Sequence, residues 1–204
     1  MPWKDLEAKK FASIRELNGI SLRTMEEHYE LYKGYVGKVN EIQKKLDAVD
    51  RTTANQIFSD LRSLRVDYSF AIGGMKNHEI FFGHLGGKGG APAGKLKEQI
   101  ARDFPSYDAW LADFKASGLA ARGWVWLAYD HDLSMLTTVV GDAQNTFPLW
   151  NATPILALDV YEHAYWLDYG RARAKYIDAF FNNLDWSVVA ANLDRALSMQ
   201  PATK

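Results

Sequence analysis

The chain has 204 residues, of which 48% are hydrophobic and 24% charged, a composition typical of a globular protein with a substantial core. Its net charge of −1 gives no reason to expect nucleic acid or an anionic membrane as a partner. The absence of cysteine excludes thiol catalysis, iron–sulfur clusters and thiolate zinc sites, so any metal must bind to His, Asp, Glu or water.

The sequence also bears on where the protein works. Its first residues, MPWKDLEAKKFASIREL, carry charges where a signal peptide would have its apolar core. No apolar run approaches the roughly 18 residues that a membrane span needs. Exported proteins of this size often contain disulfides, and this chain has no cysteine. We therefore expect a cytoplasmic protein without a membrane partner.

The first half of the chain is predicted to form two long amphipathic helices. Apolar residues recur every three or four positions over residues 22–49, and again over residues 57–85. Thr24 with Glu27 matches a capping box, which indicates the start of the first helix, and Ser21 adds a start signal just upstream. Because only a short polar turn separates the two helices, we expect them to pack as an antiparallel hairpin.

The second half is predicted to mix helices with a small sheet. The stretch GGKGGAPAG, residues 86–94, breaks the helical pattern and predicts a boundary between domains at residues 1–88 and 89–204. Aromatic and β-branched runs at 124–129 and 133–140 flank a polar turn and predict an antiparallel hairpin. The other expected elements are helices around 95–103 and 107–119, a strand at 155–159, and helices starting near Tyr161, near residue 174 and at a Ser187 cap. The fold class is therefore α+β, with an N-terminal long antiparallel helical hairpin and a C-terminal α/β domain.

Four polar residues stand among these apolar patterns. His28 and His78 each lie in the apolar stripe of one long helix, where a histidine is commonly a core residue bonded to a carbonyl or a tyrosine. Asp159 and His163 follow the apolar run ILAL, and their i, i+4 spacing lets both side chains point the same way. Alone, this pair also fits a capping aspartate beside an unrelated histidine.

Together, the three imidazoles and one carboxylate predict a metal site, since a cation offsets the cost of burying them. Nitrogen and oxygen ligands of this kind suit Fe, Mn, Co or Zn and poorly suit Ca or Mg. The spacing does not choose between a hydrolytic zinc and a redox-active iron or manganese.

Three motifs resemble those of the iron/manganese superoxide dismutases, over nearly the whole chain from about residue 20. The segment LDVYEHAYWLDYGRARAKYIDAFFNNLDW is similar to the DVWEHAYY signature of that family, GMKNHEIFF resembles its second-helix segment, and RGWVWL resembles its GSGWxWL strand. The resemblance implies that His28, His78, Asp159 and His163 hold one Mn or Fe ion per subunit, with water as a fifth ligand. It also implies that the sheet has three antiparallel strands.

The function implied by the resemblance is that of an oxidoreductase, a superoxide dismutase. One superoxide would leave as oxygen and a second, with two protons, as hydrogen peroxide, while the metal cycles its charge. The resemblance further implies a homodimer or homotetramer. Two alternatives stay open: a superoxide-dismutase-like metal-binding or interaction protein without dismutase activity, and a zinc hydrolase on a related scaffold.

The resemblance also implies residues around the metal. Tyr35 and Gln144 correspond to the tyrosine and the amide that hydrogen-bond near the metal-bound solvent, although Ala143 or Asn145 could align in place of Gln144. Simple packing of Tyr35 and an ordinary loop position for Gln144 are the alternatives. Gly74 stands where iron-type members often place a glutamine, which matches the manganese-type pattern.

The chain departs from the family at the expected substrate gateway. Tyr32 stands where a second histidine is usual, and the spacing from the first ligand to the tyrosine is one residue shorter. Trp166 replaces the second tyrosine of EHAYY, so the pair that meets across the family's dimer interface has changed jointly. Tyr161 replaces a common tryptophan, and Glu162 is implied to bridge to the partner subunit's His163.

Four further residues complete the predictions. We expect Trp124 and Trp126 to be divided by strand alternation, one towards the metal pocket and one away from it, or both to lie in the core. His84 and His131 are expected in loops or at the surface.

Overall fold

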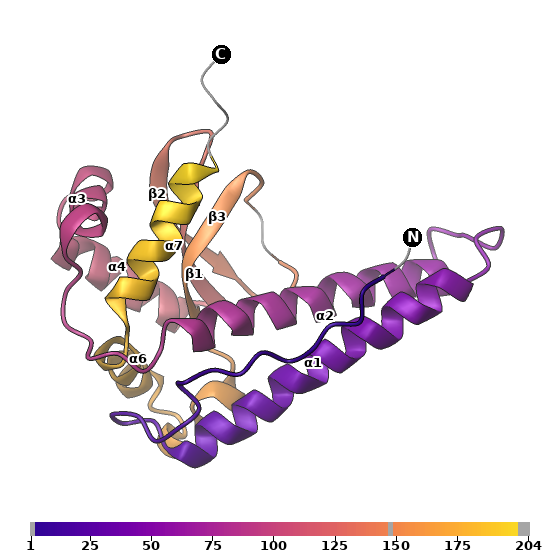
Figure 1. The fold of residues 1–204 in the computed structure, drawn as a ribbon, viewed down its shortest axis with the longest axis horizontal. Helices are drawn as coiled ribbons and strands as arrows, with labels where there is room; N and C mark the ends of the chain where they lie inside the picture. Colours follow the sequence, from indigo (N-terminus) through magenta and orange to yellow (C-terminus); the bar gives the residue numbers. More distant parts are fainter. Residues whose placement is uncertain (1–2, 147–148, 200–204) are drawn as a thin grey trace.

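The structure is a computed structural model that describes residues 3–146 and 149–199. It has the predicted α+β fold, with two long helices first and a three-stranded sheet in the second half (Figure 1). The elements in chain order are α1 Leu22–Ala48, α2 Asp60–Gly83, α3 Gly94–Asp103, α4 Tyr107–Ala120, β1 Trp124–Asp130, β2 Met135–Gly141, β3 Ala152–Asp159, a 3-10 turn Glu162–Ala164, α5 Trp166–Tyr169, α6 Arg173–Asn182 and α7 Trp186–Ser198.

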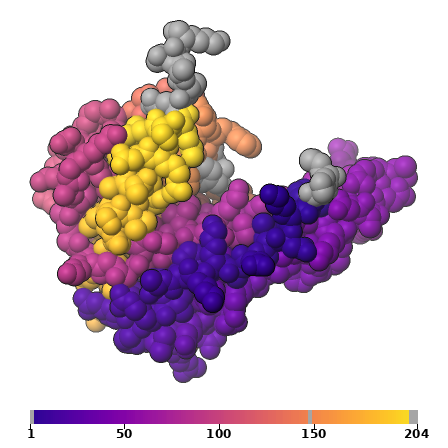
Figure 2. Space-filling model, in the orientation of Figure 1, coloured from indigo at the N-terminus to yellow at the C-terminus, as the bar shows by residue number. Residues whose placement is uncertain are grey.

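Helices α1 and α2 form the predicted antiparallel hairpin, which projects from the rest of the molecule as an arm (Figures 1 and 2). Helix α1 begins at Leu22, where the predicted pattern begins, but the predicted capping box at Thr24 does not form. Ser21 caps the helix, because its hydroxyl accepts the Thr24 backbone N–H at 3.2 Å. The predicted start of α2 is also too early: Ile57 and Phe58 precede the Ser59 cap and are 84% and 74% exposed.

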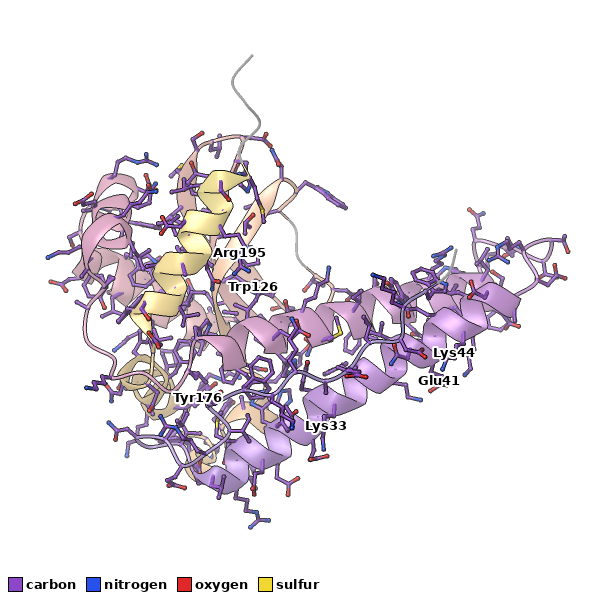
Figure 3. All side chains as sticks on the ribbon, viewed as in Figure 1. Lys33, Glu41, Lys44, Trp126, Tyr176 and Arg195 are labelled. Carbon is purple, nitrogen blue, oxygen red and sulfur yellow. The ribbon has the colours of Figure 1, made fainter. Side chains whose placement is uncertain are left out.

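The N-terminal segment, residues 3–20, lies along this arm (Figures 1 and 2). The Asn40 side chain bonds both the N–H and the carbonyl of Leu6, each at 2.9 Å. The buried Ser13 hydroxyl donates to the Phe82 carbonyl at 2.8 Å. The outer face of α1 is charged, and its Lys33, Glu41 and Lys44 side chains point away from the core (Figure 3).

The sheet has the strand order β2-β1-β3 and is antiparallel throughout. Every residue of the central strand β1 is buried. Trp124 and Trp126 stack on the same face of it, with ring centroids 6.1 Å apart and planes 14° from parallel. The predicted division of these two residues is wrong, because residues two apart on a strand point to the same side.

Two helix predictions in the last quarter also need correction. The helix expected near Tyr161 is only the 3-10 turn followed by the four-residue α5. The last helix is capped by Asp185, whose carboxylate accepts the Ser187 N–H at 3.0 Å, so Ser187 is already inside α7. Helix α7 then packs against β3 (Figure 1).

One hydrophobic core joins the arm to the sheet. It contains residues of α1 and α2, such as Met25 and Phe81, together with residues of the strands. Trp126 of β1 and Tyr176 of α6, both labelled in Figure 3, belong to the same core. A smaller cluster of Val39, Ile42, Leu46 and Ala71 fills the arm beyond it. The domain boundary between residues 88 and 89 stays a prediction. Among the described residues, no helix is both long enough and apolar enough to span a membrane.

Candidate metal centre

Four side chains from four different segments meet where α1, α2 and the end of β3 come together. The Nε2 atoms of His28 and His163 each lie 3.2 Å from Asp159 Oδ2, and Nε2 of His78 lies 3.5 Å from the same oxygen. One ligand atom from each of the four residues lies within 4.8 Å of all the others. His28, His78 and Asp159 are buried, and the His163 side chain is 26% exposed. All four residues predicted as ligands are thus brought together.

Asp159 is held at the end of β3 by three contacts. The Tyr161 backbone N–H donates to its Oδ1 at 2.9 Å, which leaves Oδ2 facing the histidines. The fully buried Tyr176 hydroxyl donates to the Asp159 carbonyl at 2.8 Å. On its other side Asp159 pairs with Trp124 of the central strand. The sequence patterns gave no role to Tyr176.

The hydrogen bonding of His78 tests whether a cation fits this site. Its Nδ1 lies 2.6 Å from the Gly74 carbonyl, which can only accept, so Nδ1 carries the proton and Nε2 of the neutral ring has a bare lone pair. That buried Nε2 has no hydrogen-bond partner among the described residues and faces the carboxylate oxygen of Asp159. Two acceptors face each other here, and a cation between them satisfies both.

The pKa shifts leave bare nitrogens on two of the histidines, whereas the pKa of His163, against the effect of burial, is raised by Asp159. Burial, and then the neighbouring His28, lower the pKa of His78 to about 3, so its ring is neutral near pH 7. Burial also lowers the pKa of His28, against the opposing effect of Asp159. Burial alone would raise the pKa of Asp159, but His163 and His28 together hold it below its usual range. An ionised carboxylate with bare imidazole nitrogens is a donor set that transition metals take.

A hydrogen-bonded chain lies beside the four residues. The Gln144 amide Nε2 donates to the Tyr35 hydroxyl at 3.3 Å, and Trp124 Nε1 donates to Gln144 Oε1 at 3.0 Å. Asn77 donates to the Gln144 carbonyl at 3.2 Å. The Tyr35 ring lies 5.4 Å from the His78 ring, centroid to centroid. Gln144 therefore supplies the amide at this place, whereas Asn145 bonds Ser69 instead. Sequence reasoning missed Asn77, although it directly precedes His78.

Comparison with known proteins identifies the family. Residues 92–192 match the family described as iron/manganese superoxide dismutases, C-terminal domain. The chain is 42% identical to "Superoxide dismutase [Fe]" of Aquifex pyrophilus, over 98% of this chain and 96% of that protein. It is 40% identical to the protein of the same name from Aquifex aeolicus, with the same coverage. The chain belongs to the iron/manganese superoxide dismutase family.

The names of the relatives do not fix the metal for this superoxide dismutase family member. Both Aquifex proteins carry iron in their names. "Superoxide dismutase [Mn] 2" of Haloferax volcanii is 37% identical over 88% of this chain and 90% of that protein. Relatives of either kind are therefore similar to the chain over most of its length.

Although the spacing between His28 and Tyr35 is one residue shorter than is usual in the family, Tyr35 still lies beside the candidate metal ligands. Helix α1 is continuous, and seven residues are close to two helical turns, so Tyr35 lies on the same face as His28. Gly74 provides the room for this tyrosine: a Cβ there would lie 2.7 Å from two of its ring carbons. A Cβ at Gly73 would lie 2.1 Å from the Gln144 carbonyl oxygen. These close approaches explain why α2 has two glycines here and why no glutamine occupies position 74.

The predicted gateway residues lie in different places. The Tyr161 ring stacks on the His163 ring at 5.3 Å, and Glu162 and Trp166 are exposed. Tyr32 is buried, but its hydroxyl accepts the Lys9 N–H at 2.9 Å and donates to Glu79 at 3.1 Å, on the side of the N-terminal segment. Among the described residues, the Tyr32 hydroxyl makes no hydrogen bond to the four candidate ligands. An open cleft of about 580 Å³ reaches His163, lined in part by Arg122, Tyr161, Glu162 and Arg173.

His84 lies in the turn that follows α2, as predicted, but not at the surface. Its side chain is fully buried, and its Nε2 accepts the Ala157 backbone N–H at 3.0 Å. No local sequence pattern distinguishes a buried turn histidine from an exposed one. His131 does lie in the turn between β1 and β2, with Nε2 2.8 Å from the Thr153 hydroxyl.

Proposed function

We propose that this chain is a superoxide dismutase that binds one Mn or Fe ion per subunit through His28, His78, Asp159 and His163. The observation that carries the proposal is the placement of three imidazole Nε2 atoms 3.2–3.5 Å from one buried carboxylate oxygen. Membership of the iron/manganese superoxide dismutase family supports the choice of a redox metal. A hydrolytic zinc centre has no comparable support.

A Mn or Fe ion held by His28, His78, Asp159 and His163 would supply one-electron chemistry, by which one superoxide would lose an electron to become oxygen and a second would gain it, with two protons, to become hydrogen peroxide. Tyr35 and Gln144 are the proposed catalytic residues of the chain itself. Burial, followed by the charge of Asp159, raises the pKa of Tyr35 to about 12, so its hydroxyl keeps its proton at neutral pH. Gln144 donates to that hydroxyl and is itself oriented by Trp124. The pair therefore holds a proton at the hydroxyl of Tyr35, whose ring lies 5.4 Å from the ring of His78.

We propose a homodimer as the smallest assembly. The Glu162 carboxylate has no hydrogen-bond or ion-pair partner among the described residues, and it lies in the open cleft beside His163. In a dimer this carboxylate would accept a hydrogen bond from the partner subunit's His163, which would orient that ring for the metal. Trp166, 48% exposed on α5, adds apolar surface to the same face. Sedimentation of wild type and Glu162→Ala distinguishes a dimer, a homotetramer and a monomer.

The experiment that tests the function measures metal and activity on one sample. Mn, Fe and Zn are quantified by elemental analysis of the purified protein, and dismutation of superoxide is assayed on the same preparation. Activity proportional to Mn plus Fe content is expected. A Zn-loaded protein without activity would favour the hydrolase, and an Mn- or Fe-loaded protein without activity would favour a binding or interaction protein.

Variants then test the site, and reconstitution tests the metal. His163→Ala is expected to lose both metal and activity, and retention of both would overturn the ligand assignment. Metal-free protein reloaded separately with Mn and with Fe shows which ion supports turnover. A cytoplasmic location, expected from the cysteine-free sequence, is proposed with the function.

A further inference from the structure

The outer edge of β3 is buried without a fourth strand. The strand order β2-β1-β3 places β3 at the edge of the sheet, yet its residues 155–159 are fully buried. Backbone groups at such an edge have no water to bond and need other partners. Two side chains provide them: His84 Nε2 accepts the Ala157 N–H at 3.0 Å, and Asn192 Nδ2 donates to the Ile155 carbonyl at 3.0 Å.

His84 is fixed from several directions. It directly follows α2, where its N–H donates to the Ile80 carbonyl at 3.3 Å and its carbonyl accepts the Asp185 N–H at 2.8 Å. Its ring packs edge-on against Phe180 at 5.7 Å. Burial lowers the pKa of His84 to about 3, so the ring is neutral and Nε2 is free to accept. The hydrogen bond to Ala157 is thus made by a side chain with little freedom to move.

Each residue of this hydrogen bond is close in sequence to one of the proposed metal ligands. Ala157 precedes Asp159 by two residues on the same strand, and both side chains therefore point to the same side of it. His84 follows His78 by six residues at the end of the same helix. The separation of His78 Nε2 from Asp159 Oδ2, 3.5 Å, depends on how closely β3 lies against α2.

We propose that His84 is a positioning residue for the metal centre, whose hydrogen bond to Ala157 locks β3 against α2 and so places Asp159 opposite His78. The proposal rests on the proposed function, because it assigns His84 a role at the same metal site. Asn192 provides the matched comparison. Asn192 lies on α7, a helix that carries no candidate ligand, and it bonds the same edge of β3 at Ile155, which is farther along the strand from Asp159 than Ala157 is.

The test compares His84→Leu, His84→Gln and Asn192→Leu with wild type, all as metal-free full-length chains titrated with Co²⁺. His84→Leu is expected to bind Co²⁺ roughly 10- to 100-fold more weakly, which is the range seen when a group that orients a metal ligand is removed. The visible spectrum of its Co²⁺ complex is also expected to differ from that of wild type. His84→Gln is expected to restore both, since its amide oxygen can accept the Ala157 N–H. Asn192→Leu is expected to lower the melting temperature while keeping the wild-type affinity and spectrum.

Amide hydrogen exchange adds a readout that needs no metal. Exchange at Ala157 is expected to accelerate in His84→Leu and to stay slow in His84→Gln. If His84→Leu does not fold, His84→Asn replaces it, because the shorter asparagine side chain does not reach the Ala157 N–H. The His84→Asn protein is then expected to bind Co²⁺ more weakly than the His84→Gln protein.

The outcomes separate this inference from the proposed function. Wild-type Co²⁺ affinity and spectrum in His84→Leu, or equal affinity of the Asn and Gln variants, would overturn the role of His84 and leave the dismutase proposal standing. A wild-type chain that binds no metal would overturn both.

Discussion

Replacing Gly74 with alanine is expected to disturb the Tyr35 ring while keeping the backbone carbonyl that bonds His78 Nδ1. The added Cβ would lie 2.7 Å from Cδ1 and Cε1 of the Tyr35 ring, whereas ordinary contacts start at 3.4 Å. The ring must therefore retreat by roughly 0.7 Å to restore an ordinary contact. Its hydroxyl already accepts from Gln144 at a long 3.3 Å, so a retreat of that size breaks the hydrogen bond.

The stability change has two opposing parts. Overpacking of a filled site costs about 1–3 kcal/mol. Alanine in place of glycine inside a helix returns about 1 kcal/mol. Gly37→Ala in α1 isolates the second part, because nothing lies within 4 Å of a Cβ at that position. The free energy of unfolding of Gly74→Ala should therefore be about 1–3 kcal/mol lower than that of Gly37→Ala.

Chemical denaturation of both variants, with metal content and dismutase activity measured on the same samples, checks this prediction. Gly74→Ala is expected to keep the wild-type metal content and to lose activity by roughly 10²-fold, the lower range for a displaced proton-transfer group. Gly37→Ala should keep full activity. Equal stability and equal activity of the two variants would refute the account of how Tyr35 packs on α2.

Three further predictions follow from other contacts. Trp124→Phe removes the donor to Gln144 and should cost about 1 kcal/mol of stability and most of the activity at unchanged metal content; loss of metal, measured by elemental analysis, would contradict its positioning role. Asn40→Ala removes both hydrogen bonds to Leu6, so limited proteolysis should cut the N-terminal segment faster than in wild type, and an unchanged rate would contradict the role of Asn40. Because the pKa of His84 is lowered to about 3 from an ordinary 6.5, the unfolded chain takes up a proton first as the pH falls. As the pH falls from 6.5 to 3, the free energy of unfolding of wild type should therefore decrease, relative to that of His84→Gln, by about 1.4 kcal/mol per pH unit. The same pH dependence of the unfolding free energy in both proteins would contradict this prediction.

Periodicity was sufficient to predict the parts of the site that lie on regular elements. The stripe of α1 contained His28, the stripe of α2 contained His78, and the buried run of β3 led into Asp159 and His163. An apolar stripe faces the core whichever neighbours it meets, so the sequence alone indicated that these residues point inward. Their convergence on one point required the packing of the arm against the sheet.

The contacts that sequence patterns missed depend on approach between distant segments. His84 was expected in a loop or at the surface, and its burial follows from the Ala157 N–H at the buried edge of β3, which no local pattern shows. Gly73 drew no prediction and Gly74 only marked the place of a family glutamine, whereas the structure relates both to the closeness of Tyr35 and Gln144. The wrong division of Trp124 and Trp126 was an error of period rather than of packing.

The most direct test of the account is where the metal lies. Crystals of the purified protein, measured at X-ray energies on both sides of the Mn and Fe absorption edges, locate either ion by its anomalous signal. The account predicts one peak per chain, in contact with His28, His78, Asp159 and His163 together. A peak elsewhere, or a metal that leaves one of these four residues uncoordinated, would contradict it.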